Sequence, residues 1–330
     1  MCIKMASVHF LVLFLTYNLY GVSAAAAHSH GMDNVERELD GSYRPRDHDH
    51  YGDSGHNTEF DHEAILGSVK ESEEFDKLSP EESKRRLELM LPKMDLNGDK
   101  FIDRLELKDW IMNSFEKLSI EEAHERLTEA DDNRDGVLTW SEYLQDAFGV
   151  DTEEEIGQED ITDSGMVRLL QEEKAMWAAA DKDGDGILDA REFEVFSNPE
   201  EHAVMHPFLV NQTLREKDAN KDGVVDFEEY IGERGSQQDK AWLVAEKDKF
   251  DHELDSNKDG VLDAQEVHAW VIPVNEEIAA EEVDHLFSLT DDNHDDLLSY
   301  DEILDHHDVF VGSEASNYGD LRDHWDDDEL

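Results

Sequence analysis

The stretch DKDGDGILDARE, residues 181–192, places acidic side chains at alternate positions, follows them with two aliphatic residues and ends on a glutamate. Carboxylates this close repel one another unless a cation lies among them. An EF-hand loop takes oxygen ligands from positions 1, 3, 5 and 12 and a backbone carbonyl from position 7, often with a water-mediated ligand at 9, and needs a glycine at position 6. Asp181, Asp183, Asp185, Glu192 and Gly186 match this template, so we expect the stretch to bind Ca²⁺.

The same template recurs five times, at residues 95–106, 131–142, 218–229, 255–266 and 291–302. Each copy has Asp at positions 1 and 5, Asp or Asn at 3, an aliphatic residue at 8 and Glu at 12. We expect the residue at position 8, Leu188 in the stretch quoted above, to point inward, where two such loops could pair. Solvated acidic turns would not repeat this spacing six times. The predicted Ca²⁺ ligands are Asp95, Asn97, Asp99 and Glu106; Asp131, Asn133, Asp135 and Glu142; Asp181, Asp183, Asp185 and Glu192; Asp218, Asn220, Asp222 and Glu229; Asp255, Asn257, Asp259 and Glu266; and Asp291, Asn293, Asp295 and Glu302.

Two copies lack the glycine at position 6. The first loop has Lys100 there, and the sixth has Asp296. A left-handed backbone conformation costs a lysine roughly 1 kcal/mol, whereas aspartate tolerates it better. We therefore predict up to six bound Ca²⁺ ions, with the first site the weakest.

The segments that flank the loops have helical signals. Ser79 with Glu82 forms a capping box followed by Pro80 at the first helical position, Ser119 with Glu122 repeats the box before the second loop, and Pro92 predicts a kink. The expected fold class is all-α, with six EF-hands arranged as three paired helix-loop-helix lobes.

EF-hands stabilise one another in pairs, and the loop spacing suggests that successive loops pair. We expect a signal peptide over 1–27 and a disordered His- and Asp-rich segment over 28–60. EF-hand pairs then occupy 61–148, 164–234 and 235–311, with an acidic linker over 149–163 and an acidic tail over 312–330.

Composition limits the functions that the chain can have. Its 85 Asp and Glu against 29 Lys and Arg give a net charge of −56, which argues against nucleic acid or an anionic membrane as a partner. The apolar run VHFLVLFL at 8–15 before small residues at 23–27 is typical of a cleaved leader, and we expect no membrane insertion after cleavage. The single Cys2 lies in that leader, so neither disulfides nor a cysteine nucleophile are expected. No pattern indicates an enzyme.

Two further patterns concern modification and metal binding. Asn211 begins the sequon NQT and is a candidate glycosylation site. His48, His50 and His56 carry side chains that bind Zn²⁺, but their spacing without a fixed scaffold is weak evidence for a site.

The six loops after a leader, with FDHEAILG at 60–67, LSPEESKRRL at 78–87, AWVIPVN at 269–275 and FVGSEASNYGD at 310–320, resemble the calumenin and reticulocalbin (CREC) family. The C-terminal DDEL is similar to an endoplasmic reticulum retrieval signal with its first residue changed to Asp327. The resemblance implies a location in the endoplasmic reticulum lumen, and the altered signal leaves Golgi passage or partial secretion open.

Two functions remain open at this stage. The resemblance implies low-affinity Ca²⁺ binding by an adaptor or chaperone-like regulator of secretory client proteins. The net charge of −56 favours basic proteins among these clients. The alternative is a luminal Ca²⁺ buffer without regulated clients. We expect a monomer in either case.

Overall fold

The computed structural model describes residues 38, 40–52, 55–153, 164–236 and 238–312, and the fold is all-α as predicted. The predicted signal peptide, most of the acidic linker and nearly all of the acidic tail lie outside these residues. Among the residues described, no helix is both long enough and apolar enough to cross a membrane.

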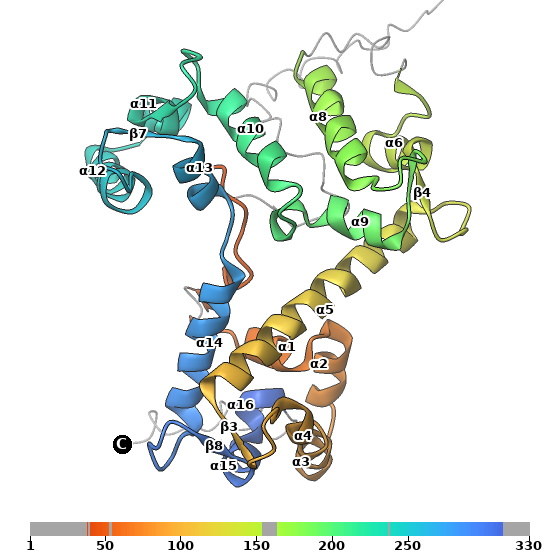
Figure 1. The fold of residues 1–330 in the computed structure, drawn as a ribbon, viewed down its shortest axis with the longest axis vertical. Coiled ribbons are helices and arrows are strands. Elements are labelled where there is room, and N and C mark those ends of the chain that lie inside the picture. The colour runs from red at the N-terminus through yellow and green to blue at the C-terminus, as the bar shows by residue number, and fades with distance from the viewer. Residues whose placement is uncertain (1–37, 39, 53–54, 154–163, 237, 313–330) are drawn as a thin grey trace, which may run out of the picture.

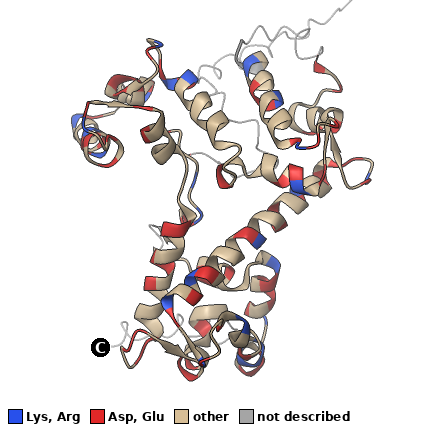
Figure 2. Ribbon diagram, viewed as in Figure 1, with Lys and Arg blue, Asp and Glu red and all other residues tan. Residues whose placement is uncertain are grey.

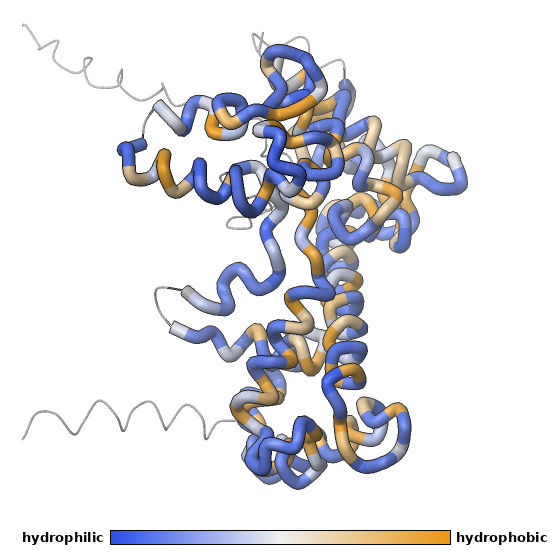
Figure 3. Tube along the Cα trace, turned by 60° about the vertical axis from the view of Figure 1, so that its left-hand side comes forward, coloured by the Kyte–Doolittle hydropathy of each residue, from blue (hydrophilic) through white to orange (hydrophobic). Residues whose placement is uncertain are grey.

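The helices form two bodies, an upper and a lower one, each around its own apolar core (Figure 1). The lower body contains α1 (Thr58–Leu66), α2 (Val69–Asp76), α3 (Pro80–Glu88), α4 (Leu91–Met94), α14 (Asn275–Thr290), α15 (Tyr300–Asp305) and α16 (His307–Val311). The upper body contains α6 (Trp140–Phe148), α8 (Ser164–Ala180), α9 (Ala190–Ser197), α10 (His206–Lys217), α11 (Phe227–Ile231), α12 (Lys240–Lys249) and α13 (Ala264–Val271), with 3₁₀ turns η1 (Pro199–Glu201) and η2 (Gly232–Ser236) and a π-helical turn η3 (Phe250–Leu254). Apolar and polar residues alternate along these helices (Figure 3), as expected for helices that each bury one side.

One continuous helix, α5 (Arg104–Ala130), joins the two bodies. It begins at position 10 of the first loop and ends directly before the second loop. The predicted helix start at Ser119 is wrong. Ser119 is fully buried in the middle of α5, where its hydroxyl donates to the carbonyl of Phe115 at 3.0 Å instead of capping a new helix. The start at Ser79 is confirmed, because its side chain accepts a hydrogen bond from the backbone N–H of Glu82 and Pro80 follows it.

The loops pair through short antiparallel strands, and the partners differ from the successive pairs predicted. The strands are β3 (Phe101–Ile102), β4 (Leu138–Thr139), β5 (Ile187–Leu188), β6 (Val225–Asp226), β7 (Val261–Leu262) and β8 (Leu298–Ser299). β3 pairs with β8, β4 with β5, and β6 with β7. The first loop therefore pairs with the sixth, the second with the third and the fourth with the fifth.

The length of α5 explains why the first two loops do not pair. A 27-residue helix is about 40 Å long, so the loops at its two ends cannot reach each other. The predicted pair boundaries at 61–148, 164–234 and 235–311 consequently do not correspond to the lobes. The first and last EF-hands, together with α1 and α2, make up the lower body.

Residues 38–57, the amino-terminal strap, were expected to be disordered, and this prediction is wrong for the residues described. The strap runs from the upper body to the lower one (red to orange in Figure 1). The backbone N–H of Tyr43 donates to the carbonyl of Val271 at 2.9 Å, and Lys249 donates to Asp40 at 3.0 Å. The strap ends in the hairpin β1 (Tyr51–Gly52) and β2 (Gly55–His56). Specific contacts with distant residues hold it, and a composition argument does not detect such contacts.

Arg46 anchors the strap at the junction of the two bodies. Its guanidinium donates to Glu201 at 2.9 and 2.7 Å and also to the hydroxyl of Ser119 on α5. Burial opposes the charged form, but Glu201 and other nearby carboxylates outweigh it and raise the pKa of Arg46. The strap, α5 and η1 thus share one charge-assisted contact.

Candidate calcium sites

All six predicted loops adopt one backbone conformation. Positions 4 and 6 have positive φ in every loop, whatever residue stands there. These residues are Gly98 and Lys100, Arg134 and Gly136, Gly184 and Gly186, Lys221 and Gly223, Lys258 and Gly260, and His294 and Asp296. Lys100 has φ +70° and Asp296 has φ +61°, so the strain predicted at position 6 is present in the first and sixth loops.

The aspartate at position 1 is oriented the same way in each loop. One carboxylate oxygen accepts a hydrogen bond from the backbone N–H of position 6, at 2.8 to 3.1 Å. The curved backbone of each loop therefore orients the aspartate at position 1, the first predicted Ca²⁺ ligand, without the help of an ion.

The glutamate at position 12 is fixed by the start of the following helix. Position 9 is the N-cap of that helix in every loop, and the glutamate carboxylate accepts from the N–H of position 9 at 2.9 to 3.1 Å. This is a complete capping box in all six cases. One side chain thus both caps the helix and faces the loop.

The carboxylates converge most clearly in the third and fifth loops. One oxygen from each of Asp181, Asp183 and Glu192 lies within 4.8 Å of the others, and Asp255, Asp259 and Glu266 do the same. Oxygens bound to one Ca²⁺ at 2.3–2.6 Å lie at most about 5 Å apart, and an all-oxygen set suits this hard cation. These residues fit Ca²⁺. Figure 2 shows that acidic residues, in red, are spread over the helices and loops of both bodies.

The asparagine at position 3 differs between loops. In the first, fourth and fifth loops its side-chain oxygen accepts from the N–H of position 5 at 2.8 to 2.9 Å. In the second and sixth loops the NH₂ of Asn133 or Asn293 donates to the position-12 glutamate at 2.8 and 3.0 Å. These two amides would have to turn to offer an oxygen to a cation.

The first loop has a further contact that sequence reasoning missed. The hydroxyl of Tyr300, from the sixth EF-hand, donates to the carboxylate of Asp95 at 3.0 Å. Burial and this hydrogen bond raise the pKa of Tyr300 to about 12, so the phenol stays protonated and keeps donating. The oxygen that accepts from Tyr300 also accepts from the N–H of Lys100. The position-6 contact is common to all six loops, but the contact with Tyr300 is an additional one that would compete with an ion for Asp95. The weakness of the first site stays a prediction.

The aliphatic residues at position 8 form the contact between paired loops, as predicted for Leu188. Ile102 lies opposite Leu298, Leu138 opposite Leu188, and Val225 opposite Leu262. All six side chains are fully buried. Pairing therefore places two candidate ion sites back to back on a shared apolar contact.

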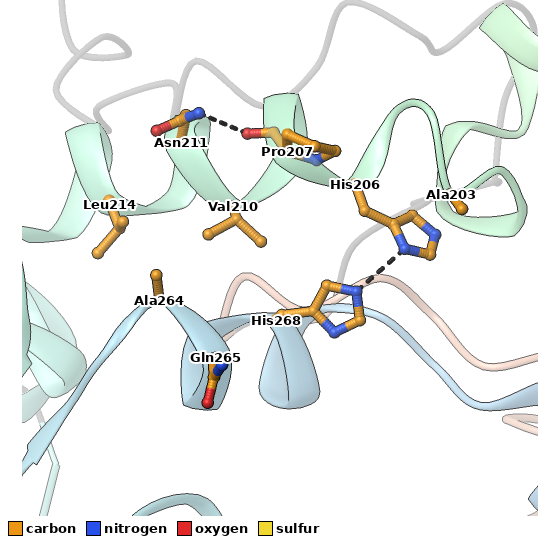
Figure 4. A pocket seen from close by; sticks show the side chains of 9 residues that line it. All are labelled: Ala203, His206, Pro207, Val210, Asn211, Leu214, Ala264, Gln265 and His268. Atoms are coloured by element: carbon orange, nitrogen blue, oxygen red, sulfur yellow. Dashed lines mark hydrogen bonds between the residues drawn. The ribbon is translucent and has the colours of Figure 1, made fainter.

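An open pocket of about 530 Å³ lies between α10 and α13 (Figure 4). Its walls include Val210, Leu214 and Ala264, and His206 and His268 contact each other at 3.0 Å at one end. α10 enters the fourth loop and α13 leaves the fifth, so both walls end at candidate ion sites.

The sequon residue Asn211 is exposed on α10 beside this pocket, and its amide donates to the carbonyl of Pro207 at 2.6 Å. Thr213, the third sequon residue, is buried. Glycosylation of Asn211 stays a prediction, and the burial of Thr213 means that it would have to precede the folding of α10.

Known proteins match this chain over the region that contains these loops. The sequence matches the EF-hand domain pair family over residues 172–233 and 247–306. It is 37% identical over 270 residues to reticulocalbin-2 of Crotalus adamanteus, covering 80% of this chain and 88% of that protein. It is 36% identical over 276 residues to reticulocalbin-2 of Mus musculus, covering 82% and 86% respectively. It is 34% identical over 331 residues to reticulocalbin-3 of Homo sapiens, covering 97% and 98% respectively. This chain is a calcium-binding EF-hand protein of the reticulocalbin family.

Proposed function

We propose that this protein binds Ca²⁺ with low affinity in the endoplasmic reticulum lumen and holds secretory client proteins in a Ca²⁺-dependent manner. The observation that carries the client-binding part is the pocket between α10 and α13, whose walls end at the fourth and fifth loops. A cation at either loop would fix the end of one wall. Ion binding and access to the pocket are then linked.

Low affinity is supported by the loops themselves. Position 6 carries left-handed strain in the first and sixth loops, and the amides of Asn133 and Asn293 are engaged with the glutamates at position 12. EF-hand modules in Ca²⁺-rich compartments bind with dissociation constants of roughly 10⁻⁴ to 10⁻³ M. Occupancy would then follow changes in luminal Ca²⁺ instead of staying saturated.

The alternative is a Ca²⁺ buffer whose pocket never receives a client. The test is a titration of the leader-free chain with Ca²⁺ in the presence of a fluorescent dye that binds apolar surfaces. We expect dye binding to rise with Ca²⁺ in the wild type. The variant Leu214→Asn, which makes one pocket wall polar, should bind less dye than the wild type in the presence of Ca²⁺. The matched control is Leu289→Asn on α14, an exposed leucine outside the pocket. Equal dye binding with and without Ca²⁺ would favour the buffer.

The luminal location is supported by the apolar run at 8–15 and by the terminal DDEL. Digestion of the cell-derived protein with endoglycosidase H tests this location together with the glycan. A mobility shift that is absent in Asn211→Gln means that Asn211 carries an immature glycan of the early secretory pathway. A glycan that resists the enzyme instead indicates Golgi passage.

A further inference from the structure

Three histidines and an aspartate gather where the amino-terminal strap meets the lower body. His50 directly precedes β1, His56 lies in β2, Asp61 in α1 and His285 in α14. One ligand atom from each lies within 4.8 Å of the others. His48, which the sequence grouped with His50 and His56, instead contacts Glu38 at 3.0 Å and is not part of this cluster.

The separations match those between the ligands of one small metal ion. The Nε2 atoms of His50 and His56 are 3.0 Å apart, and Asp61 lies 2.7 Å from His50 and 3.1 Å from His56. The Nε2 of His285 is 3.6 Å from Asp61. Zinc bonds of 2.0–2.1 Å in a tetrahedron place neighbouring ligand atoms about 3.3 Å apart.

Some of these buried polar atoms have no hydrogen-bond partner among the residues described. The Nε2 of His285 is one, since 3.6 Å is too long for a hydrogen bond. Both carboxyl oxygens of Glu282, one turn before His285 on α14, are others. Glu282 is only 2% exposed, and one of its oxygens lies 3.8 Å from the Nε2 of His50. Burial raises the pKa of Glu282 to about 9, so this carboxyl group stays protonated without a partner, and a cation beside it would relieve that cost.

The ring of His285 is also held in the orientation that a ligand needs. The hydroxyl of Tyr51 is 2.9 Å from its Nδ1, so the Nε2 faces the cluster. A metal-bound histidine is characteristically fixed by such a contact at its other ring nitrogen.

We propose that His50, His56, Asp61 and His285 bind one Zn²⁺ ion, which fastens the amino-terminal strap to α1 and α14. Three imidazoles and one carboxylate suit Zn²⁺ and not Ca²⁺, which takes oxygen ligands. The site is separate from the six loops and does not depend on the proposed client binding. It lies beside the contact between the first and last EF-hands, so its ion would stabilise the lower body.

The test uses the leader-free chain with its loops filled by millimolar Ca²⁺, so that added metal does not enter them. Co²⁺ is the probe, because a tetrahedral Co²⁺ site absorbs strongly in the visible range and Zn²⁺ displaces it. We expect one equivalent of Co²⁺ to give this absorption and one equivalent of Zn²⁺ to abolish it.

The variants His56→Gln and His285→Gln should each bind Co²⁺ at least tenfold more weakly. His252→Gln, at an exposed histidine in η3, is the matched control and should bind as the wild type does. Circular dichroism checks that each variant is folded. Zn²⁺ should also raise the melting temperature of the wild type but not of His285→Gln. No tetrahedral absorption in the wild type, or equal binding by all four proteins, would mean that the cluster is held by hydrogen bonds alone and would overturn the proposal.

Discussion

The pairing of the first EF-hand with the last can be tested by a cross-link, because the chain has no cysteine after its second residue. Phe101 and Ser299 lie directly opposite each other in the β3–β8 pair. Opposed residues in antiparallel strands have Cα atoms about 4.5–5.5 Å apart, within the range that a disulfide spans. The double variant Phe101→Cys/Ser299→Cys should therefore oxidise to a single intramolecular disulfide.

The expected gain in stability is large. The disulfide closes a loop of about 200 residues, which lowers the entropy of the unfolded chain by an amount worth about 5 kcal/mol at 25 °C. Ser299 is also the N-cap of α15, and losing its hydroxyl costs about 1 kcal/mol. The oxidised protein should be about 5 kcal/mol more stable than its reduced form and about 4 kcal/mol more stable than the wild type, because both redox forms lack the Ser299 hydroxyl. Chemical denaturation with and without a reductant measures these differences.

The control is Phe101→Cys/Thr139→Cys, which places the second cysteine in the second loop, the partner suggested by loop order. Peptide mapping of the oxidised proteins identifies any disulfide formed. Our reasoning would be refuted if this control formed its intramolecular disulfide readily and the Phe101–Ser299 pair did not.

Three further predictions concern strain, charge and the strap. Lys100→Gly should lower the Ca²⁺ dissociation constant of the first site about fivefold, because it relieves roughly 1 kcal/mol of backbone strain. Lys100→Ala, which removes only the charge, should not lower this constant. Calorimetric titration measures the dissociation constants of both variants. Burial is the largest cause, and the charges of Glu59 and Glu122 the next, that raise the pKa of Glu63 to about 7, above its value in the unfolded chain. This carboxyl group therefore lowers the stability of the fold as pH rises from the unfolded pKa to the folded pKa. Glu63→Gln should therefore stabilise the fold by on the order of 1 kcal/mol at pH 8 and hardly at pH 4, and thermal melts that show no such difference would contradict this. Arg46→Gln should cost roughly 2 kcal/mol, and a double-mutant cycle with Glu201→Gln should show that most of this loss is shared by the pair.

Sequence alone predicted the local structure of the loops well. The left-handed backbone at Lys100, the buried contact of Leu188 and the helix start at Ser79 all follow from short-range spacing, and the structure confirms each. Loop spacing also indicates that EF-hands are paired. It carries no information on which loops are partners, because that depends on the direction of the connecting helices.

The errors arose where a local signal was overridden by packing. Ser119 and Glu122 have the spacing of a capping box, but the apolar residues on either side of them continue into the cores of both bodies, so the helix does not end there. The strap has a polar composition, yet Tyr43 and His50 are both buried against residues more than 200 positions away. His285 and Asp61 could not be assigned to the His50 cluster from sequence, because no spacing rule connects them.

The β3–β8 contact also has a consequence for biosynthesis. The first loop emerges from the ribosome about 200 residues before its partner, which at 5–20 residues per second is a delay on the order of 10 to 40 seconds. During that time the lower body lacks α14, α15 and α16, and the apolar faces of α1 and α5 that they cover are open to other molecules. The lower body of a nascent chain therefore cannot close until its last EF-hand is made.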